Sequence, residues 1–196
     1  MREASLRIFA GIAAAALLAG VVYGMRAAVA HALYYQAKYG AVREHPEAVV
    51  RRCAAADNLY SRNYYACETA AKAAYSAYAG GGRGADRWFP VAGSWCAEGL
   101  ALNPYRGPLR LLKAFLLAEQ SPAEAVDYWS EYVEWNFWVP HNHAILAELQ
   151  AAAGNFHDAF ESLALIRGRE PYEAARQAVR DAWRKEMVPG GERDDR

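Results

Sequence analysis

The first hydrophobic feature of the chain is an uninterrupted apolar segment near its N-terminus. Residues 8–25, IFAGIAAAALLAGVVYGM, carry no charge, and arginines flank them on both sides. At about 1.5 Å rise per residue, a helix of this length reaches roughly 27 Å, enough to cross the hydrocarbon core of a bilayer. The pattern predicts a transmembrane anchor, or an uncleaved signal, over residues 1–26. The alternative is a cleaved secretory signal, because Ala28-Val29-Ala30 resembles a signal-peptidase site.

The charges around this segment indicate its orientation. Arg2, Arg7 and the terminal amine precede it, whereas Arg26 and Lys38 are the nearest charges after it. Basic residues are retained on the cytoplasmic side, so the N-terminus is expected there. The body of the protein is then extracytoplasmic, on the periplasmic side, as a single-pass membrane protein. A signal peptide would export the body in the same way.

Small residues recur every fourth position within the apolar segment, at Ala16, Gly20 and Gly24. Such a row lies on one helix face and lets a second membrane helix approach closely. A span this rich in alanine and glycine also produces the spacing by chance, so both interpretations stay open.

After this segment, apolar residues recur with helical spacing and turn signals separate the runs. Alanine is abundant, valine and isoleucine are sparse, and no useful stretch alternates with a period of two, so the chain is predicted to be all-α. Breaks are expected at AGGGRGAD (79–86), Asn103-Pro104 and Gly154-Asn155. The expected helices cover residues 27–43, 46–60, 63–78, 88–102, 108–118, 122–135, 140–152, 156–167 and 171–187. A flexible tail is expected over 189–196.

A period of 34 residues relates the last helices to one another. It separates Leu112 from Leu146, Ala125 from Ala159, and Trp129 from Leu163. Paired helices at this period are typical of tetratricopeptide repeats (TPRs). Residues 140–173 resemble one unit of that family closely, and the matching positions are Leu146, Ala147, Gly154, Asn155, Phe156, Ala159, Leu163 and Pro171.

The resemblance implies a solenoid of helical hairpins. It is fair over 106–139 and weak over 27–105, which we expect to form degenerate hairpins. Residues 106–188 are expected to form TPR-like repeats closed by a capping helix. Lys113 occupies a position where the family has a small residue, and Phe137 replaces its proline. An ordinary helical bundle is the alternative fold.

Charge and reactive residues narrow the function. With 22 basic and 22 acidic residues the net charge is zero, so the sequence shows no basic footprint for nucleic acid. His141 and His143 lie at the opposite end of the predicted hairpin from His157, so no metal is expected, and no cofactor is expected either. Cys53 and Cys67 fall on consecutive helices, where either a disulfide or two buried thiols fit.

The TPR resemblance implies a protein partner. The first helix of each unit faces the concave side of such an array, which makes six residues candidate contacts: Arg110, Lys113, Leu117, Asn142, Ala144 and Glu148. The aromatic residues Trp135, Phe137 and Trp138 exceed what one helix end normally buries, so a concave surface or the membrane interface is one interpretation for them. Core packing is the favoured interpretation for most of the aromatic residues. The predicted function is a membrane-tethered scaffold or adaptor that is not an enzyme. The alternatives are a structural accessory subunit of a membrane complex and, less favoured, an envelope-glycan enzyme.

Overall fold

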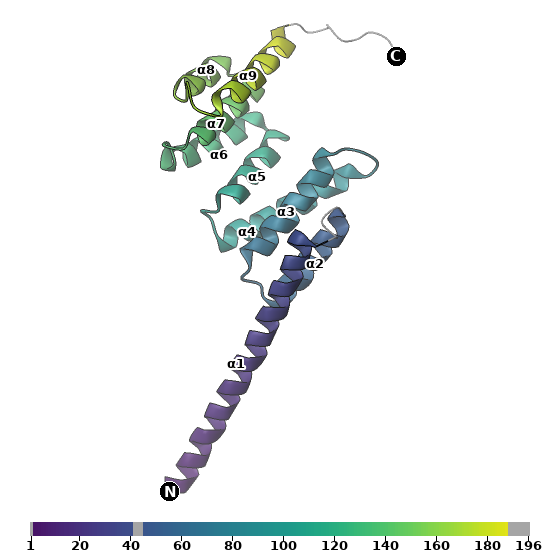
Figure 1. Cartoon of the computed structure of the whole chain (residues 1–196), viewed down its shortest axis with the longest axis vertical. Coiled ribbons are helices and arrows are strands. Elements are labelled where there is room, and N and C mark those ends of the chain that lie inside the picture. The colour runs from purple at the N-terminus through teal and green to yellow at the C-terminus, as the bar shows by residue number, and fades with distance from the viewer. Residues whose placement is uncertain (1, 41–44, 188–196) are drawn as a thin grey trace. The chain divides into compact units, whose positions relative to one another are not determined.

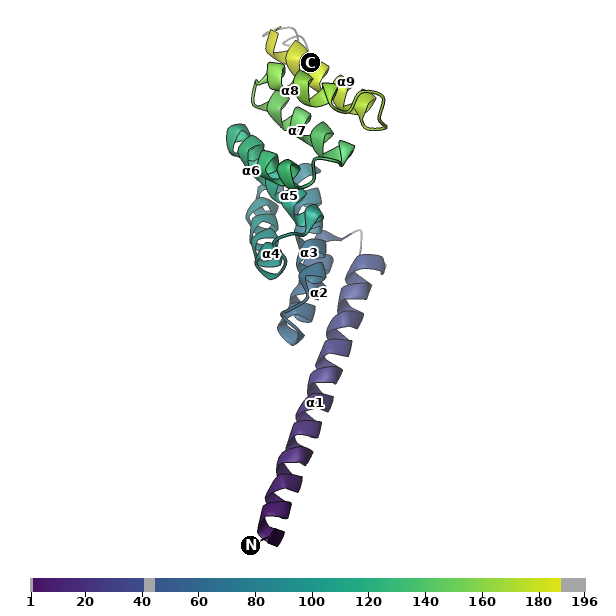
Figure 2. The same ribbon diagram turned by 90° about the vertical axis from the view of Figure 1, so that its left-hand side faces the viewer.

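The computed structural model describes residues 2–40 and 45–187, and these residues form helices and turns with no β-strand (Figures 1 and 2). The helices, with one short 3-10 turn η2, are α1 (Arg2–Tyr39), α2 (Pro46–Leu59), α3 (Tyr64–Ala79), η2 (Ala85–Arg87), α4 (Trp88–Leu102), α5 (Gly107–Ala118), α6 (Pro122–Trp135), α7 (Pro140–Ala152), α8 (Phe156–Ala164) and α9 (Tyr172–Met187). The all-α prediction is therefore confirmed for the described residues. The predicted tail 189–196, residue 188 and the end of the expected 27–43 helix lie outside them.

The chain divides into two compact units, and the boundary falls inside α5, between Leu109 and Arg110. The first unit holds α1 to α4 with the first residues of α5. The second holds the rest of α5 and α6 to α9. Each unit has its own core of buried side chains.

Helix α1 is continuous from the apolar segment into the first unit (Figure 1). Its part Arg7–Tyr39 is long and apolar enough to cross a membrane, with a mean hydropathy of 2.1 over its most apolar window. Length and composition alone also fit a signal sequence. Every side chain from Arg7 to Arg26 is exposed, so none of them is buried in the core of the unit.

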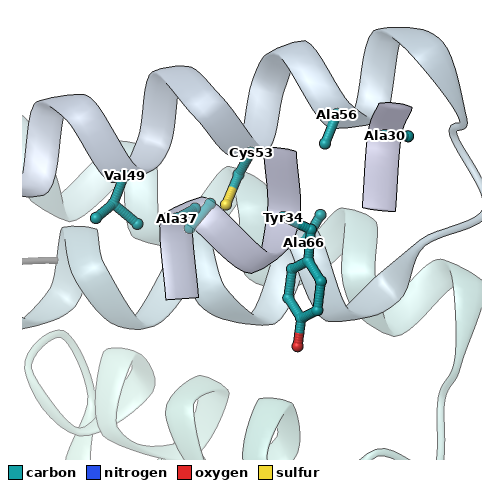
Figure 3. Packing of buried hydrophobic residues seen from close by; sticks show 8 residues of the cluster. Ala30, Tyr34, Ala37, Val49, Cys53, Ala56 and Ala66 are labelled. Atoms are coloured by element: carbon teal, nitrogen blue, oxygen red, sulfur yellow. The ribbon is translucent and has the colours of Figure 1, made fainter. Parts of the chain in front are cut away.

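The end of α1 packs against α2 and α3 through two alanines and a tyrosine. Ala30, Tyr34 and Ala37 are buried at a spacing of four and three, which places them on one helix face. They meet residues from α2 and α3 in the cluster that Figure 3 shows: Val49, Cys53, Ala56, Ala66 and Ala70. Alanines at a helix crossing let the backbones approach closely. The apolar segment therefore joins the first hairpin without a linker.

A buried carboxylate ties α3 to the loop before α5. Glu68 accepts from Arg106 Nε at 2.7 Å and from Lys72 Nζ at 2.7 Å. Burial acts to raise the pKa of Glu68, but the hydrogen bonds from Arg106 and Lys72 outweigh it, so the pKa is lowered. The carboxylate is thus charged in the folded protein at neutral pH.

In the second unit α7 lies at the centre and packs against α6, α8 and α9. Ala125 and Ala159 are fully buried, each in the cluster of its own hairpin. Ala159 shares its cluster with Ala147 and Leu163, as the repeat pattern predicts. Trp129 is 1% exposed, and its Nε1 donates to the main-chain oxygen of Asn142 at 3.0 Å, which links α6 to α7.

The turn between α7 and α8 has the geometry that its sequence predicts. Gly154 has φ +80°, the left-handed conformation that glycine adopts without a Cβ clash. Its N–H donates to Ala151 O at 3.1 Å, and Asn155 N–H donates to Gln150 O at 2.8 Å. These two bonds form a Schellman motif, which satisfies carbonyls at the end of α7.

The first hairpin of the second unit departs from the repeat pattern at one helix position. Lys113 is exposed, and the next residue, Ala114, is fully buried in the cluster that contains Ala125. A lysine cannot enter a tight crossing without losing the hydration of its ammonium. The small-residue role on α5 therefore belongs to Ala114.

Candidate functional site: a groove on α5, α7 and α9

A groove of about 800 Å³ lies in the second unit between the first helices of successive hairpins. Helix α5 contributes Leu111 and Phe115. The remaining walls come from the start of α7, from the loop before α9 and from α9 itself: Val139, Pro140, His141, Ala144, Ile145, Glu148, Arg169, Glu170, Pro171, Ala174 and Ala175. A volume of this size accommodates several side chains of a bound segment.

The groove is mostly apolar and carries charges at defined places. Glu148 is the acidic group on α7. Burial of its carboxylate raises its pKa, while His141, two helical turns earlier on the same face, acts to lower it. Arg169 and Glu170 lie in the loop that borders α9. Such a surface suits a segment with apolar side chains and a hydrogen-bond donor or cation that meets Glu148.

The sequence-based candidates fall both inside and outside this groove. Glu148 and Ala144 line it, as expected for the first helix of a unit. Arg110 and Lys113 lie elsewhere on α5, over aromatic rings of α6. The Arg110 guanidinium is 5.5 Å from the ring centre of Tyr132, and the Lys113 ammonium is 4.6 Å from that of Tyr128. Their charges therefore act within the hairpin, as cation–π contacts.

Asn142 and Leu117 serve the interior of the unit. Asn142 is buried, and its Nδ2 donates to the main-chain oxygen of Asn136 at 3.2 Å. Its own main-chain oxygen accepts from Trp129. Leu117 is half-buried against the cluster that contains Trp129. The structure thus places neither side chain in the groove, because the face of α7 that carries Asn142 meets α6.

Several groove residues were not predicted from the sequence, among them Leu111, Phe115 and Ala174. A signal for the α7 wall was present, since His141, Ala144, Ile145 and Glu148 follow a spacing of three, one and three, which defines one helix face. No comparable pattern separates the groove face of α5 from its buried face, because Leu111, Leu112, Phe115 and Leu116 are all apolar.

Comparison with solved structures supports the repeat interpretation. The chain superposes on the crystal structure of a thermophilic TPR protein from Thermus thermophilus with a TM-score of 0.62. The match covers 79% of this chain and 81% of that chain, at 17% sequence identity. The chain has a TPR-like fold. No protein-family model and no curated protein matches its sequence.

The TPR-like array also displays an aromatic patch, formed by Trp135, Phe137, Trp138 and Leu165. The three aromatic side chains are each 65% exposed and Leu165 is 71% exposed. Phe137, Trp138 and Leu165 border a second hollow of about 500 Å³, whereas Trp135 lines neither this hollow nor the groove. These side chains lie outside the groove, whereas a concave surface was one of the positions predicted for the three aromatic residues. The patch is a second candidate contact surface.

The row of small residues on α1 remains accessible. Ala16 is exposed, and a Cβ added at Gly20 or Gly24 would meet no atom within 4 Å. No described part of the chain covers this face, so a second helix can approach it.

All three cysteines are buried free thiols in the structure. Burial raises the pKa of Cys53 to about 12 and that of Cys67 to about 12. Both are therefore protonated at neutral pH, which is the state of a packed thiol and not of a nucleophile. The structure holds Cys53 and Cys67 as buried thiols, and a bond between them stays a prediction.

Two carboxyl groups meet beside Cys67 where α2, α3 and α4 pack together. Asp57, Cys67 and Glu98 have ligand atoms within 4.8 Å of one another. Burial and then the charge of Asp57 raise the pKa of Glu98. The nearby carboxylate of Asp57 thus favours the neutral form of Glu98. A cation is less well served, because the buried thiol would have to lose its proton first.

The histidines do not form a joint cluster in the part of the chain that the structure describes. His157 lies with Asp158 and Glu161 on the exposed face of α8, and its Nε2 is 3.4 Å from a Glu161 oxygen. His143 Nε2 lies 2.6 Å from the main-chain oxygen of Phe137. His141 lines the groove. The structure thus places His157 on a different surface from His141 and His143.

Proposed function

We propose that this protein is a membrane-tethered scaffold that holds a segment of a partner protein in the groove on α5, α7 and α9. The observation that supports the proposal is the groove itself, which combines apolar walls with the single acidic group Glu148 on α7. Such arrays display the first helix of each repeat to their ligands, and the groove is built from those helices. The proposal assigns the chain no chemistry of its own.

The tether in this proposal is α1. Its residues from Arg7 to Arg26 are exposed, although Tyr23 meets the ring of Tyr60, and an exposed apolar helix surface is the arrangement expected of a helix that spans a bilayer. The positions of the flanking arginines favour a periplasmic location for the array.

Two pairs of matched variants test the groove. Ala174→Trp places a large ring on an exposed position inside the groove, and Ala123→Trp makes the same change on the exposed start of α6. Glu148→Lys reverses the charge in the groove, and Glu131→Lys reverses one on the outer surface of α6. The readout is capture of the tagged full-length protein from membranes in mild detergent, with quantitative mass spectrometry of bound proteins.

We expect a partner recovered with the wild type to fall at least tenfold in both groove variants and to be retained by both controls. Equal recovery with all four variants would contradict the proposal. So would equal loss in the groove variants and the controls, since that points to unfolding; circular dichroism of each purified variant identifies it.

A second candidate function, an accessory subunit of one membrane complex, is favoured by the exposed aromatic patch. Side chains as large as Trp135 and Trp138 are seldom left 65% exposed on a monomer's surface unless they form contacts. Co-purification separates the two functions, because a subunit stays bound in stoichiometric amount and a transient adaptor washes off. For a subunit, Trp135→Ser with Trp138→Ser should release the complex while Ala174→Trp leaves it intact.

A further inference from the structure

A hollow of about 640 Å³ lies in the first unit between α1 and the turn that joins α2 to α3. The residues that α1 contributes recur at intervals of three and four, so they belong to one face of the helix: Ala15, Leu18, Ala19, Val22, Tyr23 and Arg26. The opposite wall is the turn itself, with Leu59, Tyr60, Ser61 and Arg62. This face is not the face that carries Gly20 and Gly24.

One end of the hollow is cationic. Arg26 and Arg62 both line it, and its described lining contains no carboxylate. Arg26 donates through Nη2 to the main-chain oxygen of Asn58 at 3.3 Å, which leaves its other N–H groups available. The rings of Tyr23 and Tyr60 meet edge to face with their centres 5.9 Å apart, and they join α1 to the turn beside the arginines.

The other end of the hollow is apolar. Ala15, Leu18, Ala19 and Val22 form its wall on α1. From Ala15 to Arg26 the helix rises by about 16 Å, so the hollow runs from the cationic end well into the apolar segment. Arginine and tyrosine side chains are favoured at the level of lipid headgroups, and aliphatic side chains below it. The hollow thus has the polarity profile of one lipid molecule.

We propose that this hollow binds one anionic phospholipid, with its phosphate between Arg26 and Arg62 and an acyl chain along the Ala15–Val22 face. A guanidinium group binds phosphate oxygens with two parallel hydrogen bonds, and two guanidinium groups neutralise the negative charge of an anionic headgroup. The inference rests on the proposed membrane tether, since it places Arg26 at the interface. It adds that the α2–α3 turn lies at headgroup level, so the first hairpin is seated on the bilayer.

A free phosphate ion would satisfy the cationic end alone. The apolar wall has no role for such an ion, whereas it matches an acyl chain, and for this reason the proposal commits to a lipid. Binding of a lipid would join α1 and the α2–α3 turn through one molecule.

Native mass spectrometry of the full-length protein in detergent tests the proposal. The probes are dioleoyl phosphatidylglycerol, dioleoyl phosphatidylcholine and inorganic phosphate, each added to delipidated protein. The test variant is Arg26→Gln with Arg62→Gln. Its matched control is Arg51→Gln with Arg83→Gln, which removes two exposed arginines of the same unit that do not line the hollow. A third variant, Ala19→Trp, fills the apolar end.

We expect the wild type and the Arg51/Arg83 control to retain one phosphatidylglycerol in preference to phosphatidylcholine. The bound fraction should fall at least tenfold in the Arg26/Arg62 variant and clearly in Ala19→Trp. Equal retention by wild type and the Arg26/Arg62 variant overturns the proposal. Displacement of the lipid by millimolar phosphate, with no effect of Ala19→Trp, would also overturn it, because the site would then be one for the free ion.

The same spectra separate this inference from the tether on which it rests. An intact mass of the whole chain, together with resistance of the protein to alkaline extraction from membranes, shows that α1 is kept and inserted. In that case equal lipid binding by all variants rejects the lipid site and leaves the tether standing. Loss of the N-terminal segment from the mature protein rejects both, since six of the ten residues that line the hollow leave with it.

Discussion

Replacing Gly99 by alanine should destabilise the first unit, whereas the same replacement at Gly93, in the same helix, should stabilise it. Alanine is favoured over glycine in a helix interior by about 1 kcal/mol. At Gly93 a Cβ would meet no atom within 4 Å, so that gain is kept. At Gly99 a Cβ would lie 2.7 Å from Leu109 Cδ1 and 3.0 Å from Cys67 Cβ, both closer than van der Waals contact.

The surroundings of Gly99 have little freedom to adjust. Leu109 is 0% exposed, so its methyl group cannot swing into solvent, and the Cys67 Cβ is fixed to the backbone of α3. Adding a methyl group to a filled core costs about 1–3 kcal/mol. After the helix preference for alanine is subtracted, Gly99→Ala should lower the free energy of unfolding by up to about 2 kcal/mol. The two variants should then differ by about 1–3 kcal/mol, although the chemical change is identical.

Thermal unfolding of the full-length variants in detergent, followed by circular dichroism, measures this difference. Each kcal/mol corresponds to a shift of about 2–4 °C in a chain of this length. Gly93→Ala should melt above the wild type and Gly99→Ala below it. In a Leu109→Val background, which removes the nearest methyl group, Gly99→Ala should cost less. A Gly99→Ala protein as stable as Gly93→Ala would refute the close approach of α4 to Leu109 and α3.

Three further predictions concern turns and charges. Gly154→Ala should cost about 1 kcal/mol because its φ of +80° is unfavourable for a residue with a Cβ, and Gly154→Asn should cost less; urea midpoints give the comparison. Arg106→Ala should destabilise the protein by about 1–3 kcal/mol at neutral pH, because it removes a hydrogen-bond donor from the buried Glu68 carboxylate. Folding lowers the pKa of Glu68, so the wild type should lose this stabilisation as the pH falls through the acidic range. The variant should lose less stability over the same pH range. Glu98→Gln should stabilise the protein at neutral pH and not in acid. Folding raises the pKa of Glu98, so the wild type loses stability as the pH rises through that raised value. The free energy of unfolding of both proteins, measured from pH 4 to pH 8, tests the direction of this change.

The local features of this chain were readable from its sequence because they depend on neighbours within a few residues. Pro46 opens α2, and Gly154 ends α7 in a Schellman motif, since each requires only its own backbone geometry. The 34-residue spacing links Ala125 to Ala159, and both alanines are fully buried. The pairing of helices followed from that period.

The candidate site was only partly readable. Glu148 and Ala144 were selected because the first helix of a TPR unit faces the concave side, and both line the groove. On α5 the exposed and buried faces are both rich in leucine, so the sequence could not say that Leu111 and Phe115 line the groove. Asn142 was selected because it lies on the first helix of a unit, but its side chain is buried. Its Nδ2 donates to the main-chain oxygen of Asn136, and its main-chain oxygen accepts from Trp129 Nε1.

The sequence by itself determined the helices, most of their ends, the repeat period and the apolar segment that continues into the first hairpin. These depend on backbone preferences and on the periodicity of apolar residues, which are properties of short stretches of chain. Only the tertiary structure decided that Ala114 replaces Lys113 at the crossing, that Asp57 meets Glu98, and that the α2–α3 turn faces α1. Those outcomes depend on how far each helix is rotated about its axis when it packs, and neighbours distant in the sequence set that rotation.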